Sequence, residues 1–288
     1  MAEKNITTWE QFKTALTESI TEDTTYNIKN DLDASNDILT NSIMCIDGDK
    51  NKIFRGNGYK INGITAYGNV IVFDSDQATN HDFRFYDIKF TNFMIESGTF
   101  ASLCRSSYYA SFEEYSDLFV NCFFNGVCKN FISSTTKNRI SYFTKCSFNV
   151  RCESFSGERN TFDSCYIVIT PLQNTNSFSS DSTIKSSYVE GIIRNTFSDS
   201  RYSYLTPQFN GNNVFNCKVI ITNYNDSTTY KTYNSSEPVL VNKDRLLQSD
   251  GVTPIKNIAS ATNVYFLTDE QLKNKEYIQQ NTPFPLYG

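Results

Sequence analysis

Phe119-Val120-Asn121-Cys122-Phe123-Phe124 contains the pattern that decides the fold: apolar, any residue, polar, cysteine, any residue, apolar. The pattern returns at 143–148 and 162–167, and with Ile, Ser or Cys at the centre it recurs at 85–90, 184–189 and 214–219. The central positions are 88, 122, 146, 165, 187 and 217, so successive copies lie between 19 and 34 residues apart. Self-similarity at this spacing is typical of a solenoid whose longer intervals carry loop insertions.

The geometry inside the pattern predicts a corner. The central residue and the residue two positions later share one face of a strand, because side chains alternate along it. The apolar residue three positions earlier is out of phase with them, so all three point inward only if the chain bends between them. We expect the polar residue before the centre to lie outside or at that bend, at positions Asp87, Asn121, Lys145, Ser164, Ser186 and Asn216.

The sequence therefore predicts an all-β fold, a single-stranded right-handed parallel β-helix, with a short helix at each end. We expect the cysteines at the centre of the pattern to stack on one another in a narrow interior, one per coil. The predicted core ladder is Phe119, Cys122, Phe124, Phe143, Cys146, Phe148, Phe162, Cys165, Ile167, Val214, Cys217 and Val219.

The cysteines are predicted to be buried thiols, since free cysteine is one of the most buried residue types. Cys128 and Cys152 each follow a central cysteine by six residues and are expected to form a second ladder. Stacked sulfurs in adjacent coils are close enough that disulfides stay an alternative. Metal ligation is a weaker one, because the chain has a single His and no C-x-x-C pair.

The two ends carry helix signals. Thr7 to Glu10 fits a capping box, and the following helix places Trp9, Phe12 and Leu16 on one apolar face. Near the other end we expect a strand over 264–267, and a second capping box from Thr268 that opens a helix through about residue 279. The predicted organisation is an N-terminal capping helix over 1–22, the β-helix over 23–267 and a C-terminal capping helix and tail over 268–288. Residues 222–262 lack the pattern and are interpreted as an insertion or as irregular final coils.

Composition excludes several classes of partner. The net charge is −5 and no cluster of Lys and Arg stands out, so we expect no nucleic-acid partner. No apolar run approaches the roughly 20 residues that cross a bilayer, so we expect no membrane partner. The first residues show no apolar signal-peptide region, which favours synthesis and folding in the cytoplasm.

Four features together resemble the pectate-lyase-like right-handed β-helix superfamily, over roughly residues 5 to 220. They are Trp9-Glu10-Gln11-Phe12 on a helix, a strand that ends Asn30-Asp31-Leu32-Asp33, the stretch 56–63 (Gly-Asn-Gly-Tyr-Lys-Ile-Asn-Gly) and the repeated Phe-x-Asn-Cys-x-Phe. The closing stretch 267–274, with Pro283-Phe284-Pro285, is similar to the ends of β-helix proteins of phages and of gut-bacterial surfaces. This superfamily includes polysaccharide lyases, glycoside hydrolases, phage tailspikes and non-catalytic fibres, so the resemblance leaves the activity open.

Candidate catalytic residues are few. Asp74 and Asp76 follow an apolar strand and would share a face, which fits a calcium site or, as we favour, a solvated turn. Arg194 is a candidate for the proton-abstracting base of a lyase, without an evident acidic partner set. His81 has no glycine neighbours and is interpreted as a loop residue rather than a general acid or base. No phosphate loop or G-x-S-x-G motif is present, and we expect no cofactor.

We therefore expect a non-catalytic structural or attachment component of a bacteriophage virion, made in the host bacterial cytoplasm. Its expected partners are other virion proteins, with a homotrimer as one arrangement, and a host surface glycan as a candidate ligand. Tyr108, Tyr109 and Phe112 lie in the longest interval between repeats and are candidate contact residues, although their rings would equally suit the core. The alternatives are a polysaccharide lyase or depolymerase that acts on a host surface glycan, and a cellular adhesin.

Overall fold

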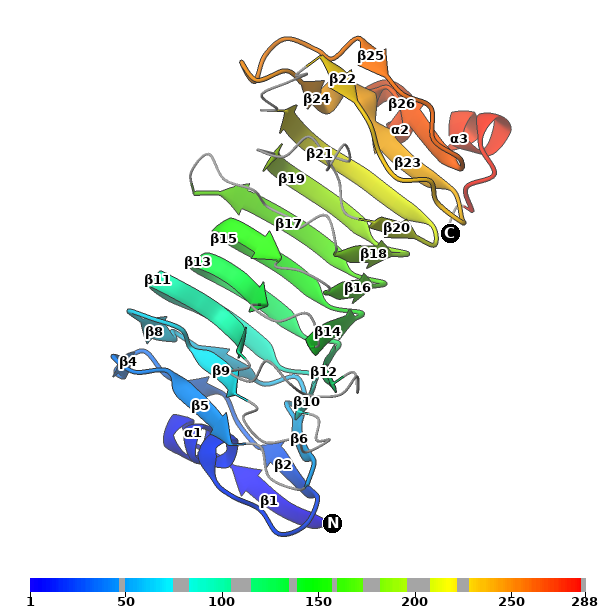
Figure 1. Cartoon of the computed structure of the whole chain (residues 1–288). Coiled ribbons are helices and arrows are strands. Elements are labelled where there is room, and N and C mark those ends of the chain that lie inside the picture. Colours follow the sequence, from blue (N-terminus) through cyan, green and yellow to red (C-terminus); the bar gives the residue numbers. More distant parts are fainter. Residues whose placement is uncertain are drawn as a thin grey trace, which may run out of the picture.

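A computed structural model describes residues 1–46, 50–74, 83–104, 115–134, 139–156, 160–172, 182–195, 208–221 and 228–285. The chain winds into a stack of coils, with the first strand at one end of the stack and the C-terminal helices at the other (Figure 1). The strands of both large sheets pair in parallel, each with the equivalent strand of the next coil. The predicted parallel β-helix is confirmed.

Each coil contributes to two large sheets. In the described residues the first sheet runs, in spatial order, through β1 (Ala2–Ile6), β2 (Thr24–Ile28), β6 (Lys52–Arg55), β10 (Phe83–Tyr86), β12 (Tyr115–Val120), β14 (Arg139–Thr144), β16 (Thr161–Asp163), β18 (Thr183–Lys185) and β20 (Gln208–Asn210). The second, which we call the long sheet, runs through β3 (Leu32–Asp33), β7 (Lys60–Asn62), β11 (Lys89–Cys104), β13 (Phe123–Ser134), β15 (Ser147–Ser156), β17 (Tyr166–Pro171), β19 (Tyr188–Asn195), β21 (Asn213–Ile221), β23 (Val239–Asn242) and β26 (Val264–Leu267).

Shorter strands complete the stack at its two ends. β4 (Ile38–Leu39), β5 (Ile43–Ile46), β8 (Thr65–Ala66) and β9 (Ile71–Asp74) extend the long sheet beside β11, and β24 (Leu246–Leu247) pairs with β21. β22 (Thr229–Tyr230) and β25 (Asn257–Ile258) form a separate pair. The described residues also form the helices α1 (Trp9–Thr17), α2 (Asp269–Lys273) and α3 (Lys275–Asn281) and the 3₁₀ turn η1 (Lys243–Arg245).

The corner between the two sheets lies where the pattern predicts it. Asp87, Asn121, Lys145, Ser164 and Ser186 have positive φ angles of 57°, 53°, 55°, 57° and 47°. This left-handed conformation turns the chain within one residue, and Asn and Asp tolerate it better than most residues do. The corner N–H groups donate to the next coil, for example from Asn121 N to Thr144 O at 2.9 Å.

Stacked rings fill the interior. Phe54, Phe85, Phe119, Phe143 and Phe162 form one ladder with ring centroids 4.7–5.1 Å apart and interplanar angles of 9–13°. The residues of two further ladders are Phe90, Phe124 and Phe148, and Phe100, Phe131 and Phe155. Parallel coils with identical spacing bring like side chains into register, so each ring packs on the ring of the next coil.

Cys122, Cys146 and Cys165 occupy consecutive coils at the centre of the pattern. The thiols of Cys146 and Cys165 donate to the carbonyls of Phe119 and Phe143, each at 3.3 Å. Cys128 and Cys152 are paired in register in the long sheet, as expected. The cysteines that the structure describes are all buried free thiols, and burial raises the pKa of Cys152 to about 12. Thiols with raised pKa values form little thiolate and react slowly.

The predicted register of the last motif copy is wrong. In this coil the ladder residue is Phe209, which pairs with Ile184, and Asn213 takes the central position, where its Oδ1 accepts the N–H of Ser187. Cys217 is buried four residues later, beside Gly191, and so does not stack with the other three cysteines.

Three neighbouring assignments shift with it. Val214 is half-buried on the outer face, Val219 is buried beside Ile193, and the left-handed corner is Gly211 rather than Asn216. A period of two cannot distinguish registers that differ by an even number of residues, which is the physical reason for the error.

The first helix is capped one residue later than predicted. Thr8 is the N-cap, its side chain accepts the N–H of Gln11, and the Gln11 side chain accepts the N–H of Thr8. Glu10 instead pairs with Lys13 at 2.7 Å. Trp9, Phe12 and Leu16 are buried as expected. The residues before this helix form β1, which the pattern did not indicate.

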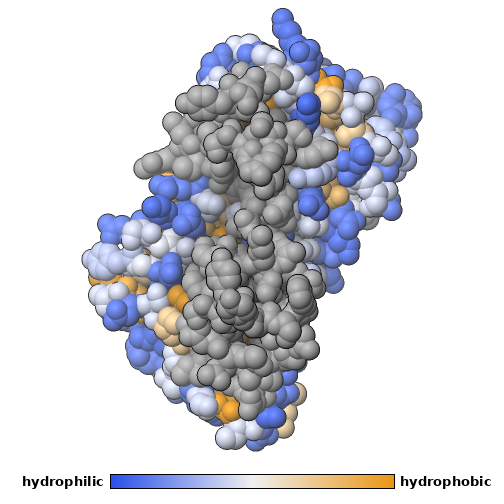
Figure 2. All heavy atoms as spheres, in the orientation of Figure 1, coloured by the Kyte–Doolittle hydropathy of each residue, from blue (hydrophilic) through white to orange (hydrophobic). Residues whose placement is uncertain are grey.

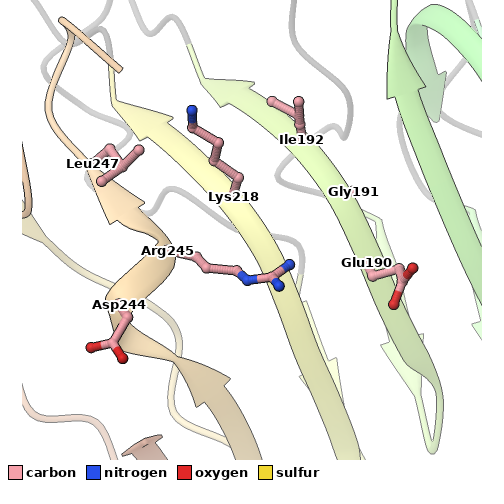
Figure 3. A pocket seen from close by; sticks show the side chains of 7 residues that line it. All are labelled: Glu190, Gly191, Ile192, Lys218, Asp244, Arg245 and Leu247. Atoms are coloured by element: carbon pink, nitrogen blue, oxygen red, sulfur yellow. The ribbon is translucent and has the colours of Figure 1, made fainter. Parts of the chain in front are cut away.

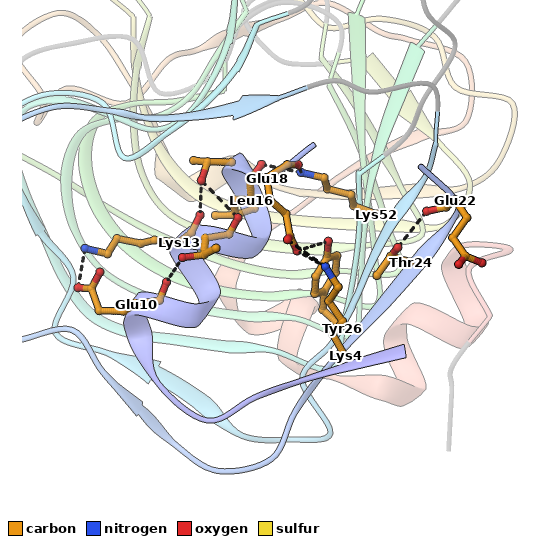
Figure 4. Close-up of polar contacts among 11 residues, drawn as sticks. Lys4, Glu10, Lys13, Leu16, Glu18, Glu22, Thr24, Tyr26 and Lys52 are labelled. Carbon is orange, nitrogen blue, oxygen red and sulfur yellow. Dashed lines mark hydrogen bonds and ion pairs between the residues drawn. The ribbon is translucent and has the colours of Figure 1, made fainter. Parts of the chain in front are cut away.

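Polar contacts fasten this helix to the first coils, as Figure 4 shows. The Lys52 side chain, 1% exposed, donates to the carbonyls of Leu16 and Glu18 at 3.0 and 2.6 Å. The Glu18 carboxylate accepts Tyr26 Oη at 2.7 Å and pairs with Lys4 at 2.9 Å. We call Lys4, Glu18, Tyr26 and Lys52 the N-terminal lock.

The C-terminal region continues the stack. Its strand β23 pairs with β21 and β26, so the described part of 222–262 contributes a final coil. The predicted helix is divided at Asn274, whose side chain caps α3. A second apolar cluster of Leu240, Leu267, Ile278 and Phe284 joins α3 and the tail to the outer face of the last coils. The strand over 264–267 and the Thr268 capping box are confirmed.

Candidate functional site

The outer face of the long sheet changes character towards its C-terminal end. Tyr166, Tyr188, Val214 and Leu240 are register neighbours in β17, β19, β21 and β23. The first two rings are stacked, with centroids 5.3 Å apart and planes 11° apart, and Tyr166 is 48% exposed. Val214 and Leu240 pack instead against the C-terminal helices and tail. The tyrosine pair, Tyr166 and Tyr188, is therefore an accessible aromatic surface on rigid strands.

A hydrogen-bond chain crosses the strands next to this pair. Tyr188 Oη donates to Glu190 at 2.8 Å and accepts Asn216 Nδ2 at 3.0 Å. Asn242 Nδ2 donates to Asn216 Oδ1 at 2.7 Å and to Asp269 Oδ1 at 3.0 Å. Asn242 is fully buried. The chain of bonds holds these side chains in fixed positions from β19 to the start of α2.

A pocket of about 480 Å³ opens beside this chain of bonds, and we call it the outer pocket. It lies over β19, β21 and η1, and Figure 3 shows its lining side chains. They are Glu190, Gly191, Ile192, Lys218, Asp244, Arg245 and Leu247. Ile192 and Leu247 provide apolar walls, and the remaining side chains are charged. A pocket of this size with few convergent polar groups is typical of a small-ligand or sugar subsite.

Gly191 is the one lining residue that must be glycine. Its φ is +127°, and a Cβ there would lie 2.0 Å from the carbonyl oxygen of Ile169 in the preceding coil. No other residue fits both the dihedral angle and the close approach. The pocket therefore has a floor of bare backbone at this point.

The charged groups of the outer pocket differ in the hydrogen bonds and ion pairs that they already make. Arg245 donates from Nη1 to Asn216 O at 3.2 Å, and its Nη2 lies 3.6 Å from Asp269 Oδ1. Asp244 accepts the N–H of Asp269 at 2.8 Å. Lys218 has no hydrogen bond or ion pair with any residue that the structure describes. The two carboxylates are thus already bonded, whereas the cations retain donors.

This arrangement suits binding better than proton transfer. Burial, together with the hydrogen bond to Glu190, raises the pKa of Tyr188 above its usual value of 10.0, so its phenol stays protonated and is a poor base. Arg245 extends across β21 towards Glu190, and the Asp244 carboxylate points away from Glu190 (Figure 3). Glycosidases need two carboxyl groups that face one bond, and these two do not.

A second pocket of about 340 Å³ lies between this face and the C-terminal helices. Its apolar walls are Val214, Leu240, Leu272, Ile278 and Phe284, and Tyr188, Asn216, Asp269, Lys273 and Lys275 add polar groups. Tyr188 and Asn216 are neighbours of Glu190 and Lys218 along the same two strands. The two pockets therefore follow each other along the strands of β19 and β21.

The candidate functional residues named from the sequence have no described side chains. Asp76, His81, Tyr108, Tyr109 and Phe112 lie outside the described residues, as do the side chains of Asp74 and Arg194, whose backbones belong to β9 and β19. Sequence reasoning missed Glu190, Lys218 and Arg245. Glu190 and Lys218 are the outward neighbours of Val189 and Cys217, so strand alternation could have signalled them, but only the register brings them together.

No protein-family model, curated protein or solved structure matches the chain. In the described ranges, no group of three or more His, Cys, Asp and Glu side chains is arranged to hold a metal ion, and no helix is long and apolar enough to cross a bilayer.

Proposed function

We propose that this chain is a non-catalytic attachment component of a bacteriophage particle and holds a host surface glycan on the outer face of its long sheet. The observation that carries the glycan part is the tyrosine pair beside the outer pocket. A flat ring packs against the C–H face of a sugar, while amides and charged groups beside it bond the hydroxyls. The rigid sheet holds these groups in place before binding, which lowers the entropic cost of binding.

The surface visible in the space-filling view (Figure 2) also favours a hydrated ligand. In the space-filling view, the coloured part of the visible face is mostly hydrophilic, and its hydrophobic residues form small separate patches (Figure 2). Permanent subunit interfaces are more apolar than this. The virion part of the proposal has different support, namely the resemblance of residues 267–274 and 283–285 to the ends of β-helix proteins of phages and of gut-bacterial surfaces.

One measurement tests the virion part of the proposal, and another tests the glycan part. Mass spectrometry of particles purified from the culture that produces the chain should find it at a fixed copy number, and its recovery only from the soluble fraction would refute the virion part. Purified chain should co-sediment with host cells, and replacing Tyr166 by Ala should reduce that binding without unfolding the protein. Equal sedimentation of Tyr166→Ala and the unchanged chain would refute the glycan part.

A polysaccharide lyase is the second candidate, because the outer pocket places two cations beside a carboxylate. A lyase would shorten the host polysaccharide and produce an unsaturated sugar that absorbs ultraviolet light. We expect the polysaccharide to keep its length after incubation with the chain. Accumulation of unsaturated products, abolished by replacing Lys218 or Arg245, would establish the lyase instead.

A further inference from the structure

The outer pocket holds a cation whose charge is not balanced by any described residue. Some lysines on the described surface are paired, such as Lys185 with Asp163 at 3.0 Å and Lys273 with Asp269. Lys218 projects from β21 into the pocket lining with no such partner among the described residues. Beside Lys218, β21 lies between β19 and β24, so the backbone of this residue is held in the sheet.

Arg245 adds a second set of donors to the pocket lining. A guanidinium has five N–H donors in one plane. Only one hydrogen bond from this group, to Asn216 O, is described, with a longer contact to Asp269. That bond and contact orient the guanidinium over β21, and donors remain for a ligand (Figure 3).

The two carboxylates that line the pocket do not pair with Lys218 or Arg245, although Asp269, outside the lining, lies 3.6 Å from Arg245. Glu190 accepts the Tyr188 hydroxyl, and Asp244 accepts a backbone N–H at the start of α2. Both carboxylates are therefore held by other groups at positions that Lys218 and Arg245 do not contact within ion-pair distance in the described structure. An anion that enters the pocket meets two cationic side chains, a bare backbone floor at Gly191 and apolar walls.

We propose that the outer pocket binds an acidic unit of a surface glycan, with the anionic group on Lys218 and Arg245. This inference rests on the proposed glycan function and specifies the chemistry of its ligand. The anion is a carboxylate or a phosphate, because guanidinium and ammonium groups bind both. Glu190 then accepts a hydroxyl of the same sugar, and the neighbouring tyrosine pair contacts the next unit.

Ligand-observed NMR with simple sugars tests the pocket. The probes are glucuronate, glucose 6-phosphate and glucose, added to the full chain. We expect one or both acidic sugars to bind more tightly than glucose, and their comparison identifies the carboxylate or the phosphate as the preferred group. Replacing Lys218 by Gln should weaken acidic-sugar binding about tenfold, as expected for the loss of one charge-assisted hydrogen bond.

Lys243→Gln is the matched control, because Lys243 lies in η1 next to the pocket but does not line it. It should leave the affinity unchanged, and both variants should keep the far-ultraviolet spectrum of the parent chain. Equal binding of glucose and the acidic sugars, or equal loss in both variants, would overturn the inference and leave the glycan function standing. Absence of binding by every sugar and by host cells would refute both proposals.

Discussion

Lysines at the two ends of the solenoid have opposite environments. Near the N-terminus, Lys52 is buried and donates to the two carbonyls at the end of α1. Near the C-terminus, Lys218 lies in an open pocket without a described partner. A buried charge persists only where fixed acceptors replace water, whereas a surface charge keeps its hydration until a ligand arrives. The first lysine is thus part of the structure, and the second is available for binding.

Replacing each lysine tests these two roles with the largest expected effect. We expect Lys52→Met to lower the free energy of unfolding by about 3 kcal/mol, since it leaves two helix-end carbonyls without a donor. Lys218→Met should change it by less than about 0.5 kcal/mol, as is usual for surface positions. Urea denaturation followed by circular dichroism measures both. Similar losses in the two variants would contradict the assigned roles.

The two cysteine ladders allow a smaller contrast within the core. Cys165 donates to the Phe143 carbonyl, and its neighbour in the next coil is already Ser187, whose hydroxyl bonds to Phe162 O. We therefore expect Cys165→Ser to cost about 1 kcal/mol or less. Cys128 is fully buried without a described hydrogen bond, so Cys128→Ser should cost about 2 kcal/mol, because it buries an unpaired hydroxyl. The same denaturation experiment ranks the variants, and the reverse order would refute the interpretation.

The pH dependence of the N-terminal lock should produce the smallest effect. Burial alone would raise the pKa of Glu18, but hydrogen bonds from Tyr26 and Lys4 outweigh it and hold the pKa below 4.5. A carboxyl group whose pKa is lower in the folded state adds stability above its unfolded pKa and loses it as the pH falls through the folded one.

We expect amide exchange in β1 and β2 to accelerate as the pH falls below about 4.5, after correction for the intrinsic pH dependence of exchange, while β21 and β23 change less. Glu18→Gln should remove most of that acid-dependent change, because its amide does not titrate. The reference is the unchanged chain at the same pH values. A Glu18→Gln variant with the same acid response would show that other groups are responsible.

Much of the fold could be predicted because its signals are local. The alternation of Phe143, Cys146 and Phe148 relative to a corner at Lys145 follows from strand geometry alone, and the structure has that corner. The capping boxes were found for the same reason, although the first is shifted to Thr8. The register of the coil that contains Asn213 could not be predicted, because Asn213 performs by hydrogen bonding what cysteine does elsewhere, and no spacing rule shows such a substitution.

The sequence by itself determined that the chain forms stacked coils with an aromatic and thiol interior, since each coil repeats the same short code of apolar side chains. The sequence did not determine which side chains of the outer face lie close together in space. Glu190, Lys218 and Arg245 come from three different coils or turns, and only the parallel register places them around one pocket. Register depends on the lengths of the intervening turns and on packing across coils, which are properties of the whole stack rather than of any one segment.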